Sequence, residues 1–133
     1  MLGAAGVVQP TRGTLTRPVF SVVVPVFEEA EGIEEFHRRL STTMQILGES
    51  WEAVYVNDGS RDRTLTILDG LRRDDGRMAL VNLSRNFGKE VATTAGLDHA
   101  RGDAIIVIDA DLQDPPEVIP EPVSYTHLRA HET

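Results

Sequence analysis

The feature that most constrains this chain is an apolar run that ends directly in carboxylates, in residues 104–116 (AIIVIDADLQDPP). Its first five residues are Ala, Ile or Val, a composition typical of a short strand buried on both faces of a parallel sheet. Asp109 and Asp111 follow at once, and open α/β sheets bind their ligands at this carboxyl end of a strand. Two prolines, at 115 and 116, prevent the chain from continuing as a regular strand. The segment predicts a ligand site just beyond a buried strand.

Asp109, Asp111 and Gln113 offer a compact set of oxygen atoms of the kind that Mg²⁺ and Mn²⁺ prefer in proteins. In an extended segment Asp111 and Gln113 would point to the same side, which makes them the better-placed metal ligands. Asp109 would then be freer to accept a hydrogen bond from a ribose hydroxyl. A bound cation would neutralise the charge that develops when a sugar diphosphate departs. An Asp-x-Asp pair also occurs in plain surface turns, but its surroundings favour a site for a metal and a nucleotide sugar.

The rest of the chain alternates between predicted strands and predicted helices. Apolar runs rich in β-branched residues predict strands over 19–27, 51–57, 78–83 and 104–108, with Pro25 where the first of them ends. Helices are predicted from the acidic residues 28–31 to Gly48, over 64–71 and over 89–100. Helical crossovers of this length join parallel strands with a right-handed connection. We therefore expect an α/β fold, a doubly wound and mostly parallel sheet with helices on both faces, as in Rossmann-like nucleotide-binding domains.

Acidic residues follow three of these strands, at Glu28, Asp58 and Asp109. Because the carboxyl ends of parallel strands lie at one edge of a sheet, we expect the three to converge on one crevice. There Asp58 would accept hydrogen bonds from the N–H groups of a nucleobase. Its segment NDGSRDRT also suits a turn in which Ser60 or Asp62 caps the next helix, and both interpretations can hold together.

Pro25, Phe27 and Glu29 form a further candidate cluster at the end of the first strand, as a wall of a nucleotide pocket. Alternatively, Phe27 belongs to the core and the acidic residues 28–31 only favour a helix start. Residues 85–89 (RNFGK) are rich in hydrogen-bond donors and precede a helix whose amino end could meet a phosphate. A solvated loop explains those donors at least as well.

Composition excludes several functional classes. The chain has 133 residues, which suits one domain, and its net charge of −8 gives no general affinity for nucleic acid or anionic lipid. It contains no cysteine, which excludes disulfides and thiolate metal sites. No apolar run is long enough to cross a bilayer and the first residues lack the basic start of a signal peptide, so we expect a cytoplasmic protein. Neither Gly-x-Gly-x-x-Gly nor Gly-Lys-Ser/Thr is present, which argues against ordinary dinucleotide-binding and P-loop classes.

Three segments are expected along the chain. Residues 1–18 mix Gly, Thr, Pro and Arg without a period, which is typical of a flexible leader. Residues 19–122 would form the nucleotide-sugar-binding part. Residues 123–133 follow two prolines and have no useful period, so we expect a disordered or non-native tail there.

Four ordered strings between residues 21 and 120 resemble family 2 glycosyltransferases of the GT-A fold: SVVVPVFEEAEGI, YVNDGSRDRT, NLSRNFGKEVATTAGLDHARGD and VIDADLQDPPEVIP. They are most similar to the polyprenyl-phosphate glycosyltransferases, which act on dolichyl or undecaprenyl phosphate. The resemblance implies that the nucleotide pocket is lined by Pro25, Phe27, Glu29, Val56 and Asp58, with Asp109 and Ala110 touching the nucleoside. It also implies that Asp111 and Gln113 hold Mg²⁺ or Mn²⁺, with Asp111 as the catalytic residue. This chain departs from the family pattern at Glu28, where Asn is usual, and at Phe27, where Tyr is commoner.

The resemblance implies an inverting transfer of a sugar from a nucleotide diphosphate to a polyprenyl phosphate. An acceptor phosphate is already ionised near neutral pH, so a general base is less necessary than for a hydroxyl acceptor. Family members continue well beyond this length, and contact with the cytoplasmic face of a membrane is expected only through such additional segments. Two other interpretations stay open: a fragment that binds nucleotide without catalysis, and a phospho-acceptor signalling domain, since strand-end acidic clusters occur there as well.

Overall fold

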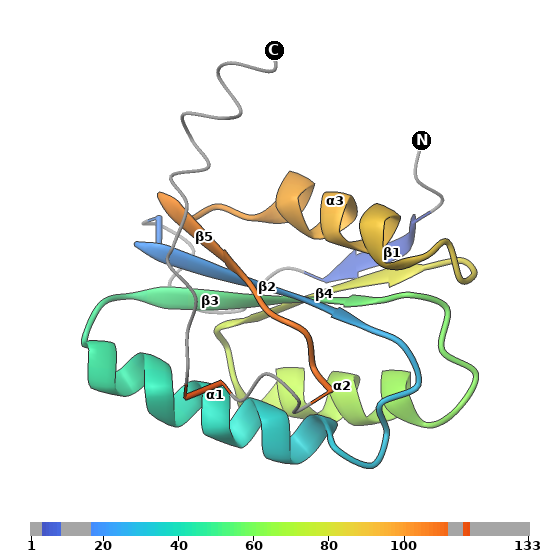
Figure 1. Ribbon diagram of the computed structural model, residues 1–133, viewed down its shortest axis with the longest axis horizontal. Helices are drawn as coiled ribbons and strands as arrows, with labels where there is room; N and C mark the ends of the chain where they lie inside the picture. Colours follow the sequence, from blue (N-terminus) through green and yellow to red (C-terminus); the bar gives the residue numbers. More distant parts are fainter. Residues whose placement is uncertain (1–3, 9–16, 112–115, 118–133) are drawn as a thin grey trace.

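The computed structural model describes residues 4–8, 17–111 and 116–117 (Figure 1). Gln113 and the predicted tail at 123–133 lie outside the described residues. In the described part of the chain, strands and helices follow one another in the order β1 (Ala4–Val8), β2 (Phe20–Val26), α1 (Ile33–Leu47), β3 (Trp51–Asn57), α2 (Thr64–Asp74), β4 (Met78–Leu83), α3 (Lys89–His99) and β5 (Ala104–Val107).

The strands form one sheet in the order β1-β4-β3-β2-β5. Strands β2 to β5 are parallel to one another, and β1 pairs antiparallel with β4. Figure 1 shows α3 on one face of the sheet and α1 and α2 on the other. The predicted α/β fold, a mostly parallel sheet covered by helices on both faces, is confirmed.

Alternating side chains of the central strands build two cores. On the α1 and α2 face, Tyr55 of β3 is fully buried with its edge against the ring of Phe36. On the α3 face, Val54 and Val56 of the same strand pack with small residues of α3. All seven residues of β3 are buried, because the strand is covered on both faces. This explains why its sequence is nearly continuous in apolar residues.

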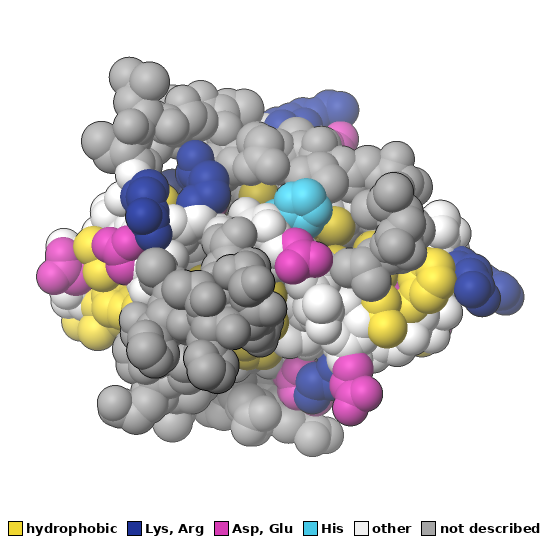
Figure 2. Space-filling model, turned by 90° about the horizontal axis from the view of Figure 1, so that it is seen from above, with side chains coloured by type: hydrophobic (Ala, Val, Ile, Leu, Met, Phe, Trp, Pro, Cys, Tyr) yellow, Lys and Arg dark blue, Asp and Glu magenta, His cyan; other side chains and the backbone are white. Residues whose placement is uncertain are grey.

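Helix α3 lies close to the sheet because its inner face carries small residues. Ala92, Ala95 and Gly96 are buried there. A Cβ atom added to Gly96 would lie 2.4 Å from Cγ1 of Val23, so only glycine fits at this contact. Figure 2 views the molecule from the α3 side, where basic side chains stand in separate groups between acidic and hydrophobic ones.

Three local features differ from the sequence prediction. The predicted leader contains β1, which forms because the outer edge of β4 offers a partner that local sequence cannot reveal. Helix α1 begins at Ile33 instead of at residues 28–31, since Glu28 has a left-handed φ of 53° that no helix accommodates. Pro25 lies inside β2, one residue before its end, beyond the last residue paired with β5. Its missing N–H therefore costs no ladder hydrogen bond.

Two buried polar side chains, those of Glu52 and His37, connect neighbouring elements by hydrogen bonds. Glu52 of β3 accepts hydrogen bonds from Ser21 Oγ at 2.5 Å and from the backbone N–H of Arg101 at 2.7 Å, which anchors the start of β5. Beneath the other face, His37 lies 2.7 Å from the hydroxyl of Tyr55 and 3.0 Å from Oδ2 of Asp75.

Burial by itself would raise the pKa of Asp75, but hydrogen bonds from His37 and Arg77 outweigh burial and hold the pKa well below its ordinary value of 3.8. The Asp75 carboxylate thus stays ionised inside the fold over most of the pH range.

In the described part of the chain no helix combines the length and apolarity that crossing a membrane requires.

Candidate functional site

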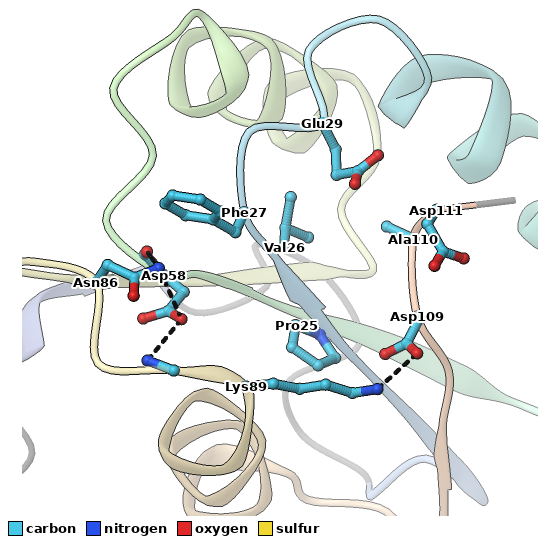
Figure 3. A pocket seen from close by; sticks show the side chains of 11 residues that line it. Pro25, Val26, Phe27, Glu29, Asp58, Asn86, Lys89, Asp109, Ala110 and Asp111 are labelled. Carbon is cyan, nitrogen blue, oxygen red and sulfur yellow. Dashed lines mark hydrogen bonds and ion pairs between the residues drawn. The ribbon is translucent and has the colours of Figure 1, made fainter.

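A pocket of about 310 Å³ opens at the carboxyl ends of β2, β3 and β5 (Figure 3). The residues that line it come from four separate segments: Pro25, Val26, Phe27, Glu29, Asp58, Asn86, Gly88, Lys89, Asp109, Ala110 and Asp111. Of the expected nucleotide-binding and metal-binding residues that the structure describes, all but Val56 lie on this lining. The acidic turns after the strands thus meet in one crevice, because parallel strands end at the same edge.

Asp58 holds the loop that leads into α3. Its side chain is buried, with Oδ1 accepting a hydrogen bond from the backbone N–H of Phe87 at 2.8 Å and Oδ2 one from Gly88 at 3.0 Å. The amide of Asn86 donates to the backbone carbonyl of Asp58 at 3.2 Å. Both carboxylate oxygens therefore already accept hydrogen bonds from the protein. This reduces their capacity for a nucleobase, and it also disfavours the phospho-acceptor interpretation, which needs an accessible nucleophilic oxygen.

Gly59 lets the same loop approach closely. Its φ is 71°, in the left-handed region, and an added Cβ would lie 2.3 Å from the backbone carbonyl carbon of Arg85. A side chain here would collide with main chain that cannot move aside. The turn after β3 therefore requires glycine for two reasons, its left-handed φ and this close approach. Asp58 and Gly59 together fix the position of residues 85–88 on the pocket wall.

The turn after β2 is fastened to the turn after β3. The backbone N–H of Glu28 donates to Ser60 Oγ at 2.8 Å, and that of Glu29 donates to Thr64 Oγ1 at 3.0 Å. Asp62 accepts a hydrogen bond from the backbone N–H of Thr64 at 3.0 Å, at the first residue of α2. Of the two predicted helix caps, Asp62 thus contacts the helix start, while the Ser60 hydroxyl serves the β2 turn.

Phe27 and Glu29 stand on the wall that this turn forms. Phe27 is 44% exposed, so it is not a core residue; it lines the pocket, and Figure 3 shows its ring on the side of Asp58 and Asn86. Partial burial raises the pKa of the Glu29 carboxyl, and the neighbouring charges of Asp111 and Asp62 raise it further. Glu29 and Asp111 both line the pocket, so their carboxylates share one space.

Lys89 is a pocket residue that the sequence analysis left unresolved. Its Nζ lies 2.7 Å from Oδ2 of Asp109, and the dashed line in Figure 3 marks this ion pair. Asn86 and Gly88 line the pocket as well, so the donor-rich loop 85–89 reaches the pocket and is not only a solvated loop. Val26 is a further lining residue without a sequence prediction.

Two predicted residues stand elsewhere. Val56 is fully buried on the α3 face of β3, because its place in the strand turns it away from the crevice and towards Gly96. Glu28 does not line this pocket but a neighbouring cavity of about 640 Å³. Gln113 lies outside the described residues.

The described residues can supply only some of the ligands that a hard divalent cation needs. No group of three or more His, Cys, Asp or Glu side chains gathers into a metal cage among residues 4–8, 17–111 and 116–117. Mg²⁺ and Mn²⁺ often take one or two carboxylates and complete their shell with water and substrate phosphates. Asp111, exposed at the rim and close enough to Glu29 to raise its pKa, fits that mode.

The family model named Glycosyl transferase family 2 matches residues 21–127. Among curated relatives, the uncharacterized glycosyltransferase YkcC of Bacillus subtilis is 50% identical over 77% of this chain and 32% of its own length. The prophage bactoprenol glucosyl transferase homolog of Escherichia coli is 50% identical over 75% of this chain and 33% of its own length. The chain thus spans about a third of the length of the curated relatives it matches.

Solved structures agree with the sequence match. The mannosyltransferase PcManGT from Pyrobaculum calidifontis, in complex with GDP-Man and Mn²⁺, has a TM-score of 0.60 at 28% identity, over 77% of this chain and 29% of that one. S. aureus TarS in complex with UDP-GlcNAc has a TM-score of 0.59 at 27% identity, over 69% of this chain and 26% of that one. Most of the chain is covered by the family match, and its sheet and helices are shared with GT-A glycosyltransferases. This chain therefore belongs to glycosyl transferase family 2.

Proposed function

We propose that this chain is the nucleotide-sugar-binding part of a metal-dependent, inverting glycosyltransferase that moves a sugar from a nucleotide diphosphate to a polyprenyl phosphate. The observation that carries the proposal is the pocket in which Phe27, Glu29, Asp109 and Asp111 meet at the carboxyl edge of the sheet. Support for the acceptor comes from relatives named bactoprenol glucosyl transferase and undecaprenyl-phosphate 4-deoxy-4-formamido-L-arabinose transferase.

Four of the pocket residues have distinct parts in donor binding. The exposed ring of Phe27 offers an apolar surface to the nucleoside, and Pro25 extends that surface along β2. The carboxylate of Asp109 accepts a hydrogen bond from a ribose hydroxyl. Asp111, together with Gln113, holds Mg²⁺ or Mn²⁺. When bound, the metal supplies positive charge that stabilises the departing diphosphate.

The transfer itself needs little proton chemistry from the protein. An ionised oxygen of the acceptor phosphate attacks the anomeric carbon from the side opposite the diphosphate. A new carbon–oxygen bond forms as the old one breaks, and the electron pair leaves with the nucleoside diphosphate, which inverts the anomeric centre. Because the acceptor carries its negative charge already, the pocket carboxylates position the donor and need not act as a base.

Calorimetry with UDP and with GDP, each with and without Mn²⁺, tests donor binding by the chain. We expect binding that depends on Mn²⁺ and that weakens at least about tenfold in Asp111→Asn, because the metal loses the charged member of its proposed ligand pair, Asp111 and Gln113. Asp98→Asn is the matched control, since Asp98 is exposed on α3 away from the pocket. Mn²⁺-independent binding, or equal binding by Asp111→Asn, would contradict the proposal.

A second candidate function is nucleotide binding without transfer, which is favoured by the chain covering about a third of its relatives. Transfer of a labelled sugar to undecaprenyl phosphate separates the two functions. Turnover by the chain supports the transferase, whereas Mn²⁺-dependent nucleotide binding without turnover supports the binding fragment.

A further inference from the structure

The lining of the pocket is strongly unbalanced in charge. Four carboxylates line it, those of Glu29, Asp58, Asp109 and Asp111, against the single ammonium of Lys89 among the lining residues that the structure describes. A nucleoside diphosphate brings further negative charge into this space. Without compensation its phosphates would be repelled by these carboxylates.

Lys89 stands where it can provide such compensation. It is the first residue of α3, so its backbone and its side chain both belong to the positive end of that helix. Its side chain is 65% exposed and reaches from the loop wall to Asp109 on the opposite wall, with 2.7 Å between Nζ and Oδ2. An ion pair this exposed stabilises the fold by little. The Lys89–Asp109 ion pair can therefore open when a more highly charged anion, such as a diphosphate, enters the pocket.

The position of Lys89 does not depend on that ion pair. The Asp58 carboxylate holds the backbone N–H groups of Phe87 and Gly88, the two residues immediately before Lys89. The Asp58 carboxylate thus fixes the start of α3 to the end of β3. Only the flexible part of the lysine side chain has to move for Nζ to change its partner.

We infer that Lys89 is a donor-binding residue that exchanges its partner: it neutralises Asp109 in the free protein and contacts the diphosphate of the nucleotide once the donor binds. The inference rests on the proposed function and deepens it. In the free state Lys89 also opposes a bare cation, both by its own charge and by occupying Asp109. The residue thereby favours entry of metal together with nucleotide over entry of metal alone.

This exchange predicts effects of opposite sign in Lys89→Met. Affinity for Mn²⁺ alone, measured by electron paramagnetic resonance, should rise about threefold, because one positive charge leaves and Asp109 is released. Affinity for UDP at saturating Mn²⁺, measured by calorimetry, should fall about fivefold, because the diphosphate loses a cationic partner. Lys89→Arg keeps the charge and should leave both affinities within about twofold of the unmodified chain.

Arg61→Met is the matched control, since it removes the same charge from an exposed residue that lines the neighbouring cavity instead. The inference is overturned if Lys89→Met weakens Mn²⁺ and UDP binding together, if it changes neither, or if Arg61→Met gives the same pair of changes. An unmodified chain that binds neither Mn²⁺ nor UDP refutes the proposed function along with it. Normal binding by the unmodified chain with no effect of Lys89→Met refutes the inference alone.

Discussion

Replacing Asp58 with asparagine should destabilise the fold and loosen the pocket loop in a way that can be measured residue by residue. Asp58 is 3% exposed, and its carboxylate accepts hydrogen bonds from the backbone N–H groups of Phe87 and Gly88 at 2.8 and 3.0 Å. Asparagine keeps one acceptor oxygen and turns the other into an NH₂ group, which faces an N–H donor. A buried hydrogen bond to a charged group contributes about 1.5–3 kcal/mol.

We therefore expect Asp58→Asn to lower the free energy of unfolding by about 2–3 kcal/mol, since one charge-assisted bond is lost and the other becomes neutral. In a domain of this size that corresponds to a fall in Tm of about 10 °C. Urea denaturation gives the free energy, and amide hydrogen exchange shows whether Phe87 and Gly88 lose protection. Asp98→Asn, on the exposed side of α3, should change neither quantity. Unchanged stability in Asp58→Asn, with unchanged exchange at both amides, would refute the role assigned to Asp58.

Two further predictions concern the packing and the buried charge of the fold. Gly96→Ala should lower the free energy of unfolding by about 1–3 kcal/mol, because its Cβ would lie 2.4 Å from Val23. Gly70→Ala, in α2 with nothing within 4 Å of the added Cβ, should instead raise it by about 0.5–1 kcal/mol, and chemical denaturation compares the two. Asp75→Asn should destabilise most at neutral pH. The pKa of Asp75 is lowered in the fold, so its stabilisation is present above the unfolded value near 3.8 and is lost as the pH falls further. The free energies of unfolding of the unmodified chain and of Asp75→Asn, measured by denaturation between pH 7 and pH 3, should therefore approach each other at the acidic end. A difference in free energy that stays constant over this pH range would contradict the ionic role of Asp75.

Local patterns in the sequence decided the elements of this fold and the edge at which the site forms. The ranges 51–57 and 78–83 predicted two strands that the structure has with the same bounds. Apolar runs that switch into acidic turns also placed Asp58, Asp109 and Asp111 at one edge, because right-handed crossovers make consecutive strands parallel. These features are determined locally, since strand periodicity and turn chemistry depend on residues only a few positions apart.

Tertiary structure alone decided how the site is held and charged. The carboxylate of Asp58 meets backbone groups 29 and 30 residues later in the chain, and Lys89 meets Asp109 across 20 residues. No local pattern distinguishes a lysine in a solvated loop from one that reaches across a pocket. Glu28 likewise has a left-handed backbone, donates its N–H to Ser60 of the next turn and lines the neighbouring cavity. Charge balance in the pocket is therefore a property of packing, because it depends on distances between walls that only the folded sheet brings together.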